Sequence, residues 1–503
     1  MRSFSAFFLL TILLFSVLGC DSVVEDTEPS QSVSQEVALS NPDAILGVRA
    51  SMFDRMHDEQ TSTDWLLGPA AYGDNTFARA GQARHRDLNE NNNRSGIGTG
   101  AYDEIYDLIN DANVLVSGIE EGAFPNPDVA DKLEAEGLFM RALAMHHATR
   151  IFGYDPDGQG GVVDPNSGPG QGFNSGIQIK TTPTLDLENA KDTPRSTVSE
   201  VYGQITSDLE DAIGIYQNLS SDVKENSPFF PSEAAAQALM ARVKLYQRDW
   251  GAAGTRAQNA LDLASSALGS GLAGSDSGSV RSIFDERSGN PEAIFTIQTD
   301  PQAGESPGVN DALSAYTSIF WGAQLPTQDL IDLYEPGDAR LAGWYDPCFD
   351  EDSGSPFNGC DLINDDGFEL KKWASERDPN QYADNHPHFR VAEMVLIQAE
   401  ARLNQSGVSE AIDRLNDLRE QRNASTLNAS NFDPSSALQE ILDERRRELV
   451  AEGHRFFDQK RLGRDIRKVR GIDDIQFRDR AILDDYPDGE LLTDDSLSGN
   501  PGY

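Results

Sequence analysis

Apolar residues recur every three or four positions in several long blocks of this chain, and this period most limits what it can fold into. The blocks at 101–119, 130–151 and 197–219 each keep one apolar stripe, which in the first block comprises Ile105, Leu108, Ile109, Ala112, Leu115 and Ile119. Because a helix turns once every 3.6 residues, such a stripe faces one side and packs against a neighbour. We therefore predict long amphipathic helices here.

Two later pairs of blocks are shorter. The first pair, 232–246 and 252–264, is rich in alanine, and the second, 390–404 and 408–422, repeats its plan before a longer block at 436–461. Paired short helices with small residues where they cross are typical of tetratricopeptide-type hairpins, which bury their faces by stacking. Strand signal is sparse and is clearest at 293–298. The sequence predicts a mainly α, tetratricopeptide-like helical-repeat scaffold with long irregular loops and little β structure.

Long stretches rich in Gly, Asp, Asn and Pro separate the helical blocks, chiefly 154–194, 269–290 and 301–388. Loops of this length in a compact protein are usually functional. We expect the loops at 154–194 and 301–388 to be functional.

The N-terminus carries an export signal. Arg2 precedes an apolar run that is too short to span a membrane, and the run ends in Val-Leu-Gly-Cys at Cys20. This ending resembles the lipobox of bacterial lipoproteins, although a plain secretory signal would also fit. Several acyl chains on Cys20, each gaining about 0.8 kcal/mol per buried methylene, would anchor the protein durably. We expect a signal peptide at 1–19, a flexible acidic tether at 20–40 and one helical domain at 41–503.

Acidic residues outnumber basic ones by 83 to 41, which gives a net charge of −42 spread along the whole chain. Such a surface repels itself and favours a saline medium, where ions screen the charge, although an ordinary acidic surface is the alternative. Nucleic acid is not an expected partner, because no basic patch is available to neutralise phosphates.

The two cysteines beyond Cys20 are Cys348 and Cys360, which lie in one Gly/Asp/Asn-rich stretch. In an exported protein two such close cysteines suggest a disulfide. Two free thiols remain the alternative.

The block at 444–458 packs carboxylates, arginines and His454 together. Glu444, Glu448 and Glu452 follow one another at one-turn intervals with arginines between them, which is typical of ion pairs that lock a helix against its neighbours. Catalysis would need two groups that converge on a substrate with separated pKa values, so we predict a structural role. The adjacent His146 and His147 lack the spacing of a zinc helix, and we expect them to pack.

One loop begins like a calcium site. Asp155 and Asp157 alternate ahead of Gly158, but Asn166 stands where the bidentate glutamate of a calcium loop belongs. An acidic turn without metal is therefore the favoured interpretation, and no cofactor is expected. If calcium is bound, its ligands would include Asp155, Asp157 and, in a second turn, Asp365.

Short motifs follow one another in order along the helical blocks, from Tyr102-x-x-Ile105-Tyr106 and Glu136-Gly137-x-Phe139-x-Arg141-Ala142 to Glu444-Arg445-Arg446-Arg447-Glu448-Leu449 and the terminal Asn500-Pro501-Gly502-Tyr503. Their ordered set resembles the SusD/RagB family of outer-membrane lipoproteins. The resemblance covers about 41–503. Two parts depart from it: the segment 480–492 is acidic where the family is rich in proline, and the two long loops carry no family motif.

This resemblance implies a surface-exposed lipoprotein of the outer membrane that binds a nutrient and delivers it to a SusC-like TonB-dependent transporter. The nutrient class it implies first is an oligosaccharide or polysaccharide, with peptides or other oligomers as the alternative. Binding of this kind would involve no catalysis and no contact with the membrane beyond the lipid anchor. A surface hydrolase and a purely structural scaffold are the rival interpretations.

Aromatic rings that stack on sugar faces, with amides and carboxylates that bond to hydroxyls, are the chemistry such a site needs. Candidates fall in two groups, near the N-terminus and in or beside the central loops: Trp65, Tyr72, Asp74, Asn75 and Phe77, and then Trp321, Trp344, Tyr345 and Trp373. Trp250 matches a helical position of the family, and we expect it in the core.

Overall fold

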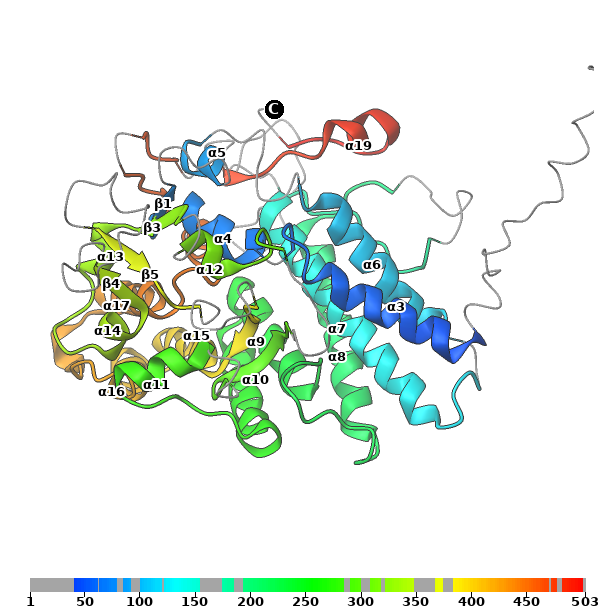
Figure 1. Ribbon diagram of the computed structural model, residues 1–503, viewed down its shortest axis with the longest axis horizontal. Coiled ribbons are helices and arrows are strands. Elements are labelled where there is room, and N and C mark those ends of the chain that lie inside the picture. The colour runs from blue at the N-terminus through cyan, green and yellow to red at the C-terminus, as the bar shows by residue number, and fades with distance from the viewer. Residues whose placement is uncertain are drawn as a thin grey trace, which may run out of the picture.

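The computed structural model describes residues 40–500 except 62, 79–84, 92–99, 120–121, 154–173, 185–192, 285–289, 300–307, 318–321, 348–366, 374–382, 470–471 and 477–481. Among these residues, helices dominate and the strands form three two-stranded antiparallel sheets (Figure 1). The predicted mainly α fold is confirmed. No described helix has the length and apolar character needed to cross a membrane.

The amphipathic blocks form a row of antiparallel helices. These are α6 (Tyr102–Ser117), α7 (Pro127–Phe152), α8 (Val198–Asn218), α9 (Glu233–Tyr246) and α10 (Trp250–Leu263). The chain enters this row through α3 (Pro42–Arg55), which lies across α6 in Figure 1. A capping box at Thr197 and Glu200 begins α8, and Ser232 caps α9. The first three predicted helices are thus confirmed to within three residues at each end.

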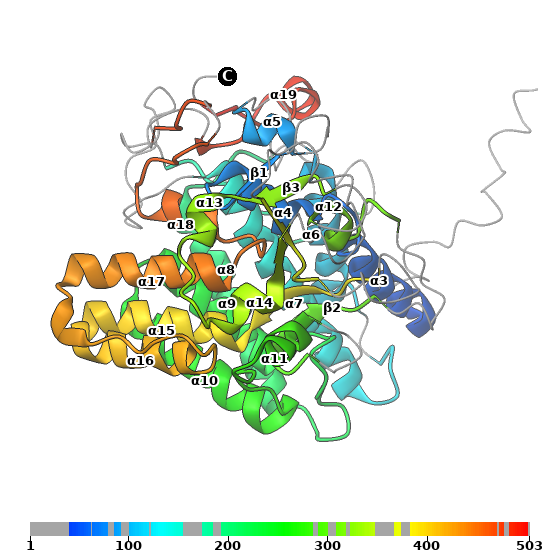
Figure 2. The ribbon, with the colours of Figure 1, turned by 60° about the vertical axis from the view of Figure 1, so that its left-hand side comes forward.

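The row continues through helices that lie far along the chain. The hairpin of α15 (Val391–Gln405) and α16 (Val408–Glu420) packs its first helix on α10, and α17 (Pro434–Glu448) packs on α15 (Figure 2). Asp249 caps α10, so that helix begins at Trp250, two residues before the block at 252–264 that the sequence indicated. Trp250 is partly buried against the main apolar core.

The predicted helix at 436–461 is wrong as one continuous element. It is broken into α17 and the short α18 (Arg455–Arg461), because the backbone between them turns through Ala451 and Gly453 with φ of 59° and 77°. A side chain at Gly453 would place its Cβ 2.4 Å from the carbonyl oxygen of Trp65. Glycine therefore permits the close approach of this turn to α4 (Thr63–Tyr72).

The predicted central loops are not wholly irregular. The stretch 269–290 holds α11 (Ser277–Arg281), and 301–388 holds α12 (Leu313–Thr317), β3 (Gln324–Pro326), α13 (Gln328–Ile331), α14 (Ala339–Trp344), β4 (Tyr345–Pro347) and β5 (Phe368–Leu370). These short elements share a second apolar cluster with Leu66, Leu67, Val450 and Ala451. They form a satellite layer on the helical row because they bury their own apolar side chains.

Two sheets tie this layer to the rest of the chain. Strand β1 (Thr76–Ala78) pairs with β3, and β2 (Ala293–Ile297) pairs with β6 (His386–Arg390), which leads directly into α15. The β2 strand confirms the expectation at 293–298. Beyond α18, Ile482, Leu483 and Tyr486 pack into the main core before α19 (Asp488–Thr493), so the acidic 480–492 segment is anchored by apolar residues.

Candidate ligand-binding pocket

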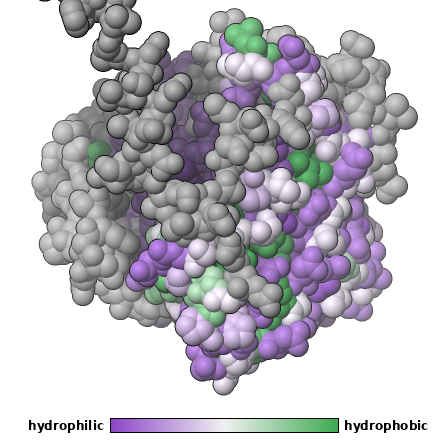
Figure 3. Space-filling view, turned by 90° about the vertical axis from the view of Figure 1, so that its right-hand side faces the viewer, coloured by the Kyte–Doolittle hydropathy of each residue, from purple (hydrophilic) through white to green (hydrophobic). Residues whose placement is uncertain are grey.

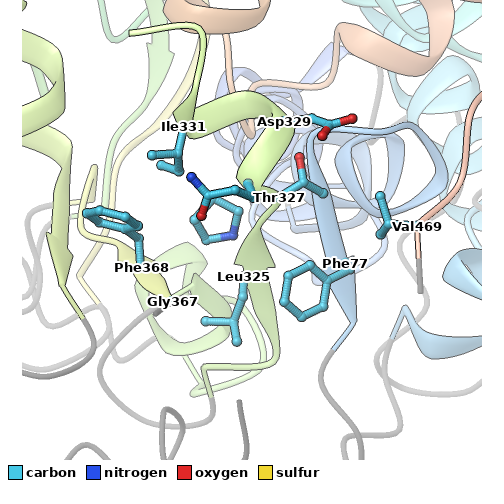
Figure 4. A pocket seen from close by; sticks show the side chains of 10 residues that line it. Phe77, Leu325, Thr327, Asp329, Ile331, Gly367, Phe368 and Val469 are labelled. Carbon is cyan, nitrogen blue, oxygen red and sulfur yellow. The ribbon is translucent and has the colours of Figure 1, made fainter. Parts of the chain in front are cut away.

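A pocket of about 240 Å³ opens where β1, β3 and α13 meet. Its lining contains one sequence-predicted ligand residue, Phe77, and reaches across to Phe368 of β5 and to Val469. Figure 4 shows Phe77 and Phe368 on opposite sides of the pocket, with Leu325 and Thr327 between them. Four segments that are separate in the sequence, at Phe77, 325–331, 367–368 and Val469, therefore build one site.

The strand pair β1–β3 fixes the floor of the pocket. Phe77 stands opposite Leu325 in the antiparallel register, and Pro326 and Thr327 then lead into α13. Thr327 is the N-cap of that helix, since its side chain accepts a hydrogen bond from the Leu330 amide. The Thr327 hydroxyl also donates to the carbonyl oxygen of Asp74 at 2.9 Å, and the Thr327 amide donates to that of Asn75 at 2.9 Å. The start of α13 is thus fastened to the segment before β1.

Asp74 and Asn75 lie behind the pocket and not in its lining. Arg455 donates to both carboxylate oxygens of Asp74, at 2.6 and 2.9 Å, and Arg446 donates to the side-chain oxygen of Asn75 at 2.9 Å. Burial acts to raise the pKa of Asp74, but the two arginines outweigh it and lower that pKa. Both side chains bond to these arginines and position the pocket from behind, and their contact with a ligand stays a prediction.

A buried lysine holds the other wall. The Lys468 ammonium donates to the carbonyl oxygens of Tyr72 at 2.8 Å, Leu88 at 3.2 Å and Ala71 at 3.4 Å, and so satisfies the C-terminal end of α4. Burial lowers the pKa of Lys468 to about 7, although Asp74 opposes the shift. Because Val469 follows directly, this contact places Val469 at the pocket.

The pocket combines apolar walls with a polar edge. Phe77, Leu325, Pro326, Ile331 and Phe368 supply the apolar surface. Thr327, Gln328 and Asp329 supply a hydroxyl, an amide and a carboxylate, and Arg467 forms an exposed ion pair with Asp329 at 3.0 Å. A sugar ring presents an apolar C–H face together with hydroxyls at its rim. The apolar walls of the pocket can pack on that face, and its polar edge can bond to the hydroxyls.

Most of the other predicted aromatic ligands are core residues here. Trp344, Tyr345 and Trp373 are buried in the second apolar cluster, where the Trp344 indole donates to the Val280 carbonyl at 3.0 Å and the Tyr345 hydroxyl meets that of Tyr334 at 3.0 Å. Trp373 packs edge-on against Phe284. These three rings are enclosed by the protein here, and their contact with a ligand stays a prediction.

Two N-terminal aromatic candidates are buried as well. Trp65 stacks on His147 with ring centroids 3.7 Å apart, and Tyr72 packs against Phe456 at 4.5 Å. Both rings therefore link α4 to the helical core, and their contact with a ligand stays a prediction. His147, predicted to pack, does so.

Several predicted sites lie outside the described residues. These are the lipidation site Cys20, the cysteine pair Cys348 and Cys360, the aromatic candidate Trp321, and the calcium candidates Asp155, Asp157 and Asp365. Among the residues that the structure does describe, no group of three or more His, Cys, Asp or Glu side chains is arranged to hold a metal ion.

The charged block at 444–458 has the structural role that we predicted. Glu448 is fully buried and meets Arg340, Arg390 and Arg422 at 2.7–2.9 Å. Glu444 also meets three guanidinium groups, the shared one of Arg340 and those of Arg419 and Arg447. Burial acts to raise the pKa of Glu444, but these arginines lower it to about 2. The block therefore joins α17 to α14, β6 and the end of α16.

Sequence reasoning missed Thr327, Asp329, Phe368 and Val469 at the pocket. A local signal existed for the first two, because threonine followed by an acidic residue in the first turn marks a helix start. No local signal could indicate Phe368 or Val469, since only the tertiary fold brings them to β1.

Two family models match the chain. One, described as the SusD family, matches residues 350–475, and the other, described as starch-binding associating with outer membrane, matches residues 26–245. The relatives include two proteins of Formosa agariphila. SusD-like protein P38 is 26% identical over 96% of this chain and 95% of its own length, and SusD-like protein P25 is 22% identical over 72% and 69%.

Solved structures share the fold. A SusD-like carbohydrate binding protein from Bacteroides vulgatus aligns with a TM-score of 0.73 at 19% identity, over 91% of this chain and 97% of its own. A SusD superfamily protein from Bacteroides thetaiotaomicron aligns with a TM-score of 0.71 at 20% identity, over 91% and 99%. The fold is therefore that of a helical-repeat scaffold of the SusD type. The chain belongs to the SusD-like family, as its ordered helical motifs indicated.

Proposed function

We propose that this protein binds an oligosaccharide or polysaccharide in the pocket between β1, β3 and α13. The observation that carries the proposal is the pair of rings Phe77 and Phe368 facing one pocket whose edge is Thr327, Gln328 and Asp329. Membership of a family with a starch-binding model supports the same ligand class. The protein acts as a binder and not as an enzyme.

Calorimetric titration against a panel of α- and β-linked glucans and other glycans, with peptides included and in high salt, tests the ligand class. We expect a glycan to bind, and Phe368→Ala and Asp329→Asn each to weaken it about tenfold, since one stacking contact or charged hydrogen bond contributes roughly 1–2 kcal/mol. Matched controls are Phe432→Ala, in another apolar cluster, and Asp413→Asn, an exposed carboxylate of α16 outside the pocket lining. Their binding should match the parent protein.

Binding of peptides without any glycan would overturn the carbohydrate assignment in favour of another oligomer. Release of shorter products from a bound glycan would instead indicate a hydrolase. Binding of no small ligand at all would favour a scaffold. The proposed binding needs no cofactor, so chelation of divalent ions should leave affinity unchanged, whereas a loss would direct attention to calcium at Asp155, Asp157 and Asp365.

We further propose that Cys20 carries the lipid that anchors the protein to the outer membrane, facing the cell exterior, and that a TonB-dependent transporter receives the nutrient. One matching family model is described as starch-binding associating with outer membrane, and this description supports the proposed location. Fractionation should find the parent protein in the membrane and Cys20→Ser in the soluble fraction, and protease added to intact cells should reach it. Purification in mild detergent should recover a large outer-membrane barrel with the lipidated form, and its absence would contradict the partnership.

A further inference from the structure

A second depression lies along α7, far from the pocket in sequence and sharing no residue with it. It consists of two adjoining hollows of about 650 and 440 Å³, which have Val116, Asp131 and Glu134 in common. The α6 and α8 helices pack on either side of α7 and form its walls. We refer to these two hollows together as the α7 groove.

Apolar side chains line part of the α7 groove without being fully covered. Val116 and Ile119 of α6, Phe124 of the α6–α7 connection and Ile215 of α8 are partly buried and pack on the main core. Figure 3 views the side of the molecule on which α3, α6 and α7 lie and shows hydrophobic side chains in a strip between hydrophilic flanks, with smaller separate patches elsewhere. A partner with an apolar stripe could therefore bury additional area in the groove.

The carboxylates of the α7 groove lack the partners that their neighbours have. Among the described residues, Asp131, Glu134 and Asp211 form no ion pair or side-chain hydrogen bond. By contrast, the nearby carboxylates Glu136, Asp208 and Glu225 are neutralised by Arg49, Arg141 and Lys132.

The three carboxylates also repel one another. Burial, together with the charges of Asp131 and Asp211, raises the pKa of Glu134. The cations nearby, Arg49, Lys132 and Arg141, are already paired with other carboxylates. The groove thus keeps uncompensated negative charge beside apolar surface.

A glycine opens the α8 wall. Gly214 lies inside α8, where glycine costs about 1 kcal/mol relative to alanine. A Cβ at this position would meet nothing within 4 Å, so packing within the chain does not require it. Gly214 lines the groove and leaves the α8 backbone accessible to a close neighbour.

We infer that the α7 groove binds a basic, amphipathic segment of a partner protein. Arginine or lysine side chains of that segment lie opposite Asp131, Glu134 and Asp211, and its aliphatic side chains lie on Val116 and Ile119. A neutral glycan would leave the three carboxylates uncompensated, and an anionic ligand would be repelled. The inference stands apart from the carbohydrate proposal, because the groove and the pocket share no residue.

The test uses a short fluorescent peptide in which arginine and leucine alternate with helical period, measured by anisotropy at physiological salt with the whole mature protein. We expect Asp131→Asn/Glu134→Gln/Asp211→Asn to weaken binding about tenfold, because three attractive charge contacts are lost. The control Glu410→Gln/Asp413→Asn/Glu420→Gln makes the same change in net charge on exposed positions of α16 and should change affinity less than about twofold.

Gly214→Leu fills the groove without changing charge and should also weaken binding, and a photoreactive version of the peptide should cross-link to α7 or α8. Equal weakening by the two triple variants would overturn the inference, since bulk charge would then account for binding. Equal binding of a peptide with glutamate in place of arginine would overturn it as well, and so would an unchanged affinity in Gly214→Leu.

Discussion

Arg390 and Glu452 form a two-pronged ion pair in the interior, with Arg390 Nε 2.7 Å from Glu452 Oε2 and Nη2 2.8 Å from Oε1. Arg390 ends β6, and Glu452 lies in the turn between α17 and α18. The same guanidinium reaches Glu292 and Glu448, so one buried network joins a strand, a turn and a helix. Its members are satisfied only in this arrangement, which makes the network a source of fold specificity and of vulnerability.

Loss of a central carboxylate should be severe. Glu448→Gln removes the negative charge that faces Arg340, Arg390 and Arg422 and leaves them partly uncompensated in the interior. Removing one partner of a buried ion pair costs about 3–5 kcal/mol. We expect this loss in the free energy of unfolding, measured by urea denaturation. Glu440→Gln, which affects a more exposed carboxylate beside Arg447, should cost less than about 1 kcal/mol; equal losses would contradict the network.

The turn at Gly453 should tolerate no side chain. Its φ of 77° and the 2.4 Å separation that a Cβ would have from the Trp65 carbonyl oxygen both oppose Gly453→Ala. We expect a destabilisation of at least about 1–3 kcal/mol. Gly47→Ala in α3, where a Cβ meets nothing within 4 Å, is the matched control and should stabilise by up to about 1 kcal/mol. Thermal unfolding followed by circular dichroism distinguishes the two.

Acid should destabilise the core at an unusually high pH. Burial, reinforced by Arg150 and Arg242, lowers the pKa of His146 well below 6.5, and the pKa of His388 is lowered to about 3. His147, His386 and His454 are shifted in the same direction by burial. A group whose folded pKa is depressed gives stability that is present above the unfolded pKa and lost as pH falls. The free energy of unfolding should therefore begin to fall as the pH drops through about 6.5, the pKa of histidine in the unfolded chain.

Chemical denaturation at steps from pH 7.5 to 5 measures this dependence. Each buried imidazole can contribute a slope of up to about 1.4 kcal/mol per pH unit, because the unfolded chain takes up a proton that the folded one refuses. Glu444 and Asp74 have lowered pKa values and lose their stabilisation only at lower pH. His146→Phe, which replaces a ring that packs on Tyr246, should reduce the slope. An unchanged slope would exclude His146 as a contributor.

Thr327, the N-cap residue of α13, should contribute both to the stability of that helix and to ligand binding in the pocket. Thr327→Val keeps the shape of the side chain but removes the hydrogen bonds to the Leu330 amide and the Asp74 carbonyl. An N-cap is worth about 1 kcal/mol, and hydrogen exchange at the Leu330 amide should accelerate. The affinity for the glycan should also fall in Thr327→Val, because the start of α13 forms part of the pocket. Thr193→Val, at a threonine outside the pocket, serves as the control and should leave the α13 amides unchanged.

The helical row was predictable because its information is local. The stripes of α6, α7 and α8 appear at the helical period in sequence, and capping residues such as Thr197 and Ser232 mark where helices begin. The interleaved charges of 444–458 likewise indicated ion pairs, since their spacing was visible in the sequence, although Glu452 lies in the turn beyond α17. Membership of the SusD-like family followed from the order of these same motifs.

The pocket was decided by tertiary structure. Trp344, Trp373 and Trp65 lie in or near Gly- and Asp-rich stretches and carry the ring chemistry of a sugar site, yet each is buried because elements elsewhere in the chain cover it. Phe77 alone among the described aromatic candidates lines the pocket, and its partner Phe368 arrives from a strand nearly three hundred residues later. Local pattern determines which side chains prefer burial, but which apolar face is left uncovered depends on how the whole chain packs.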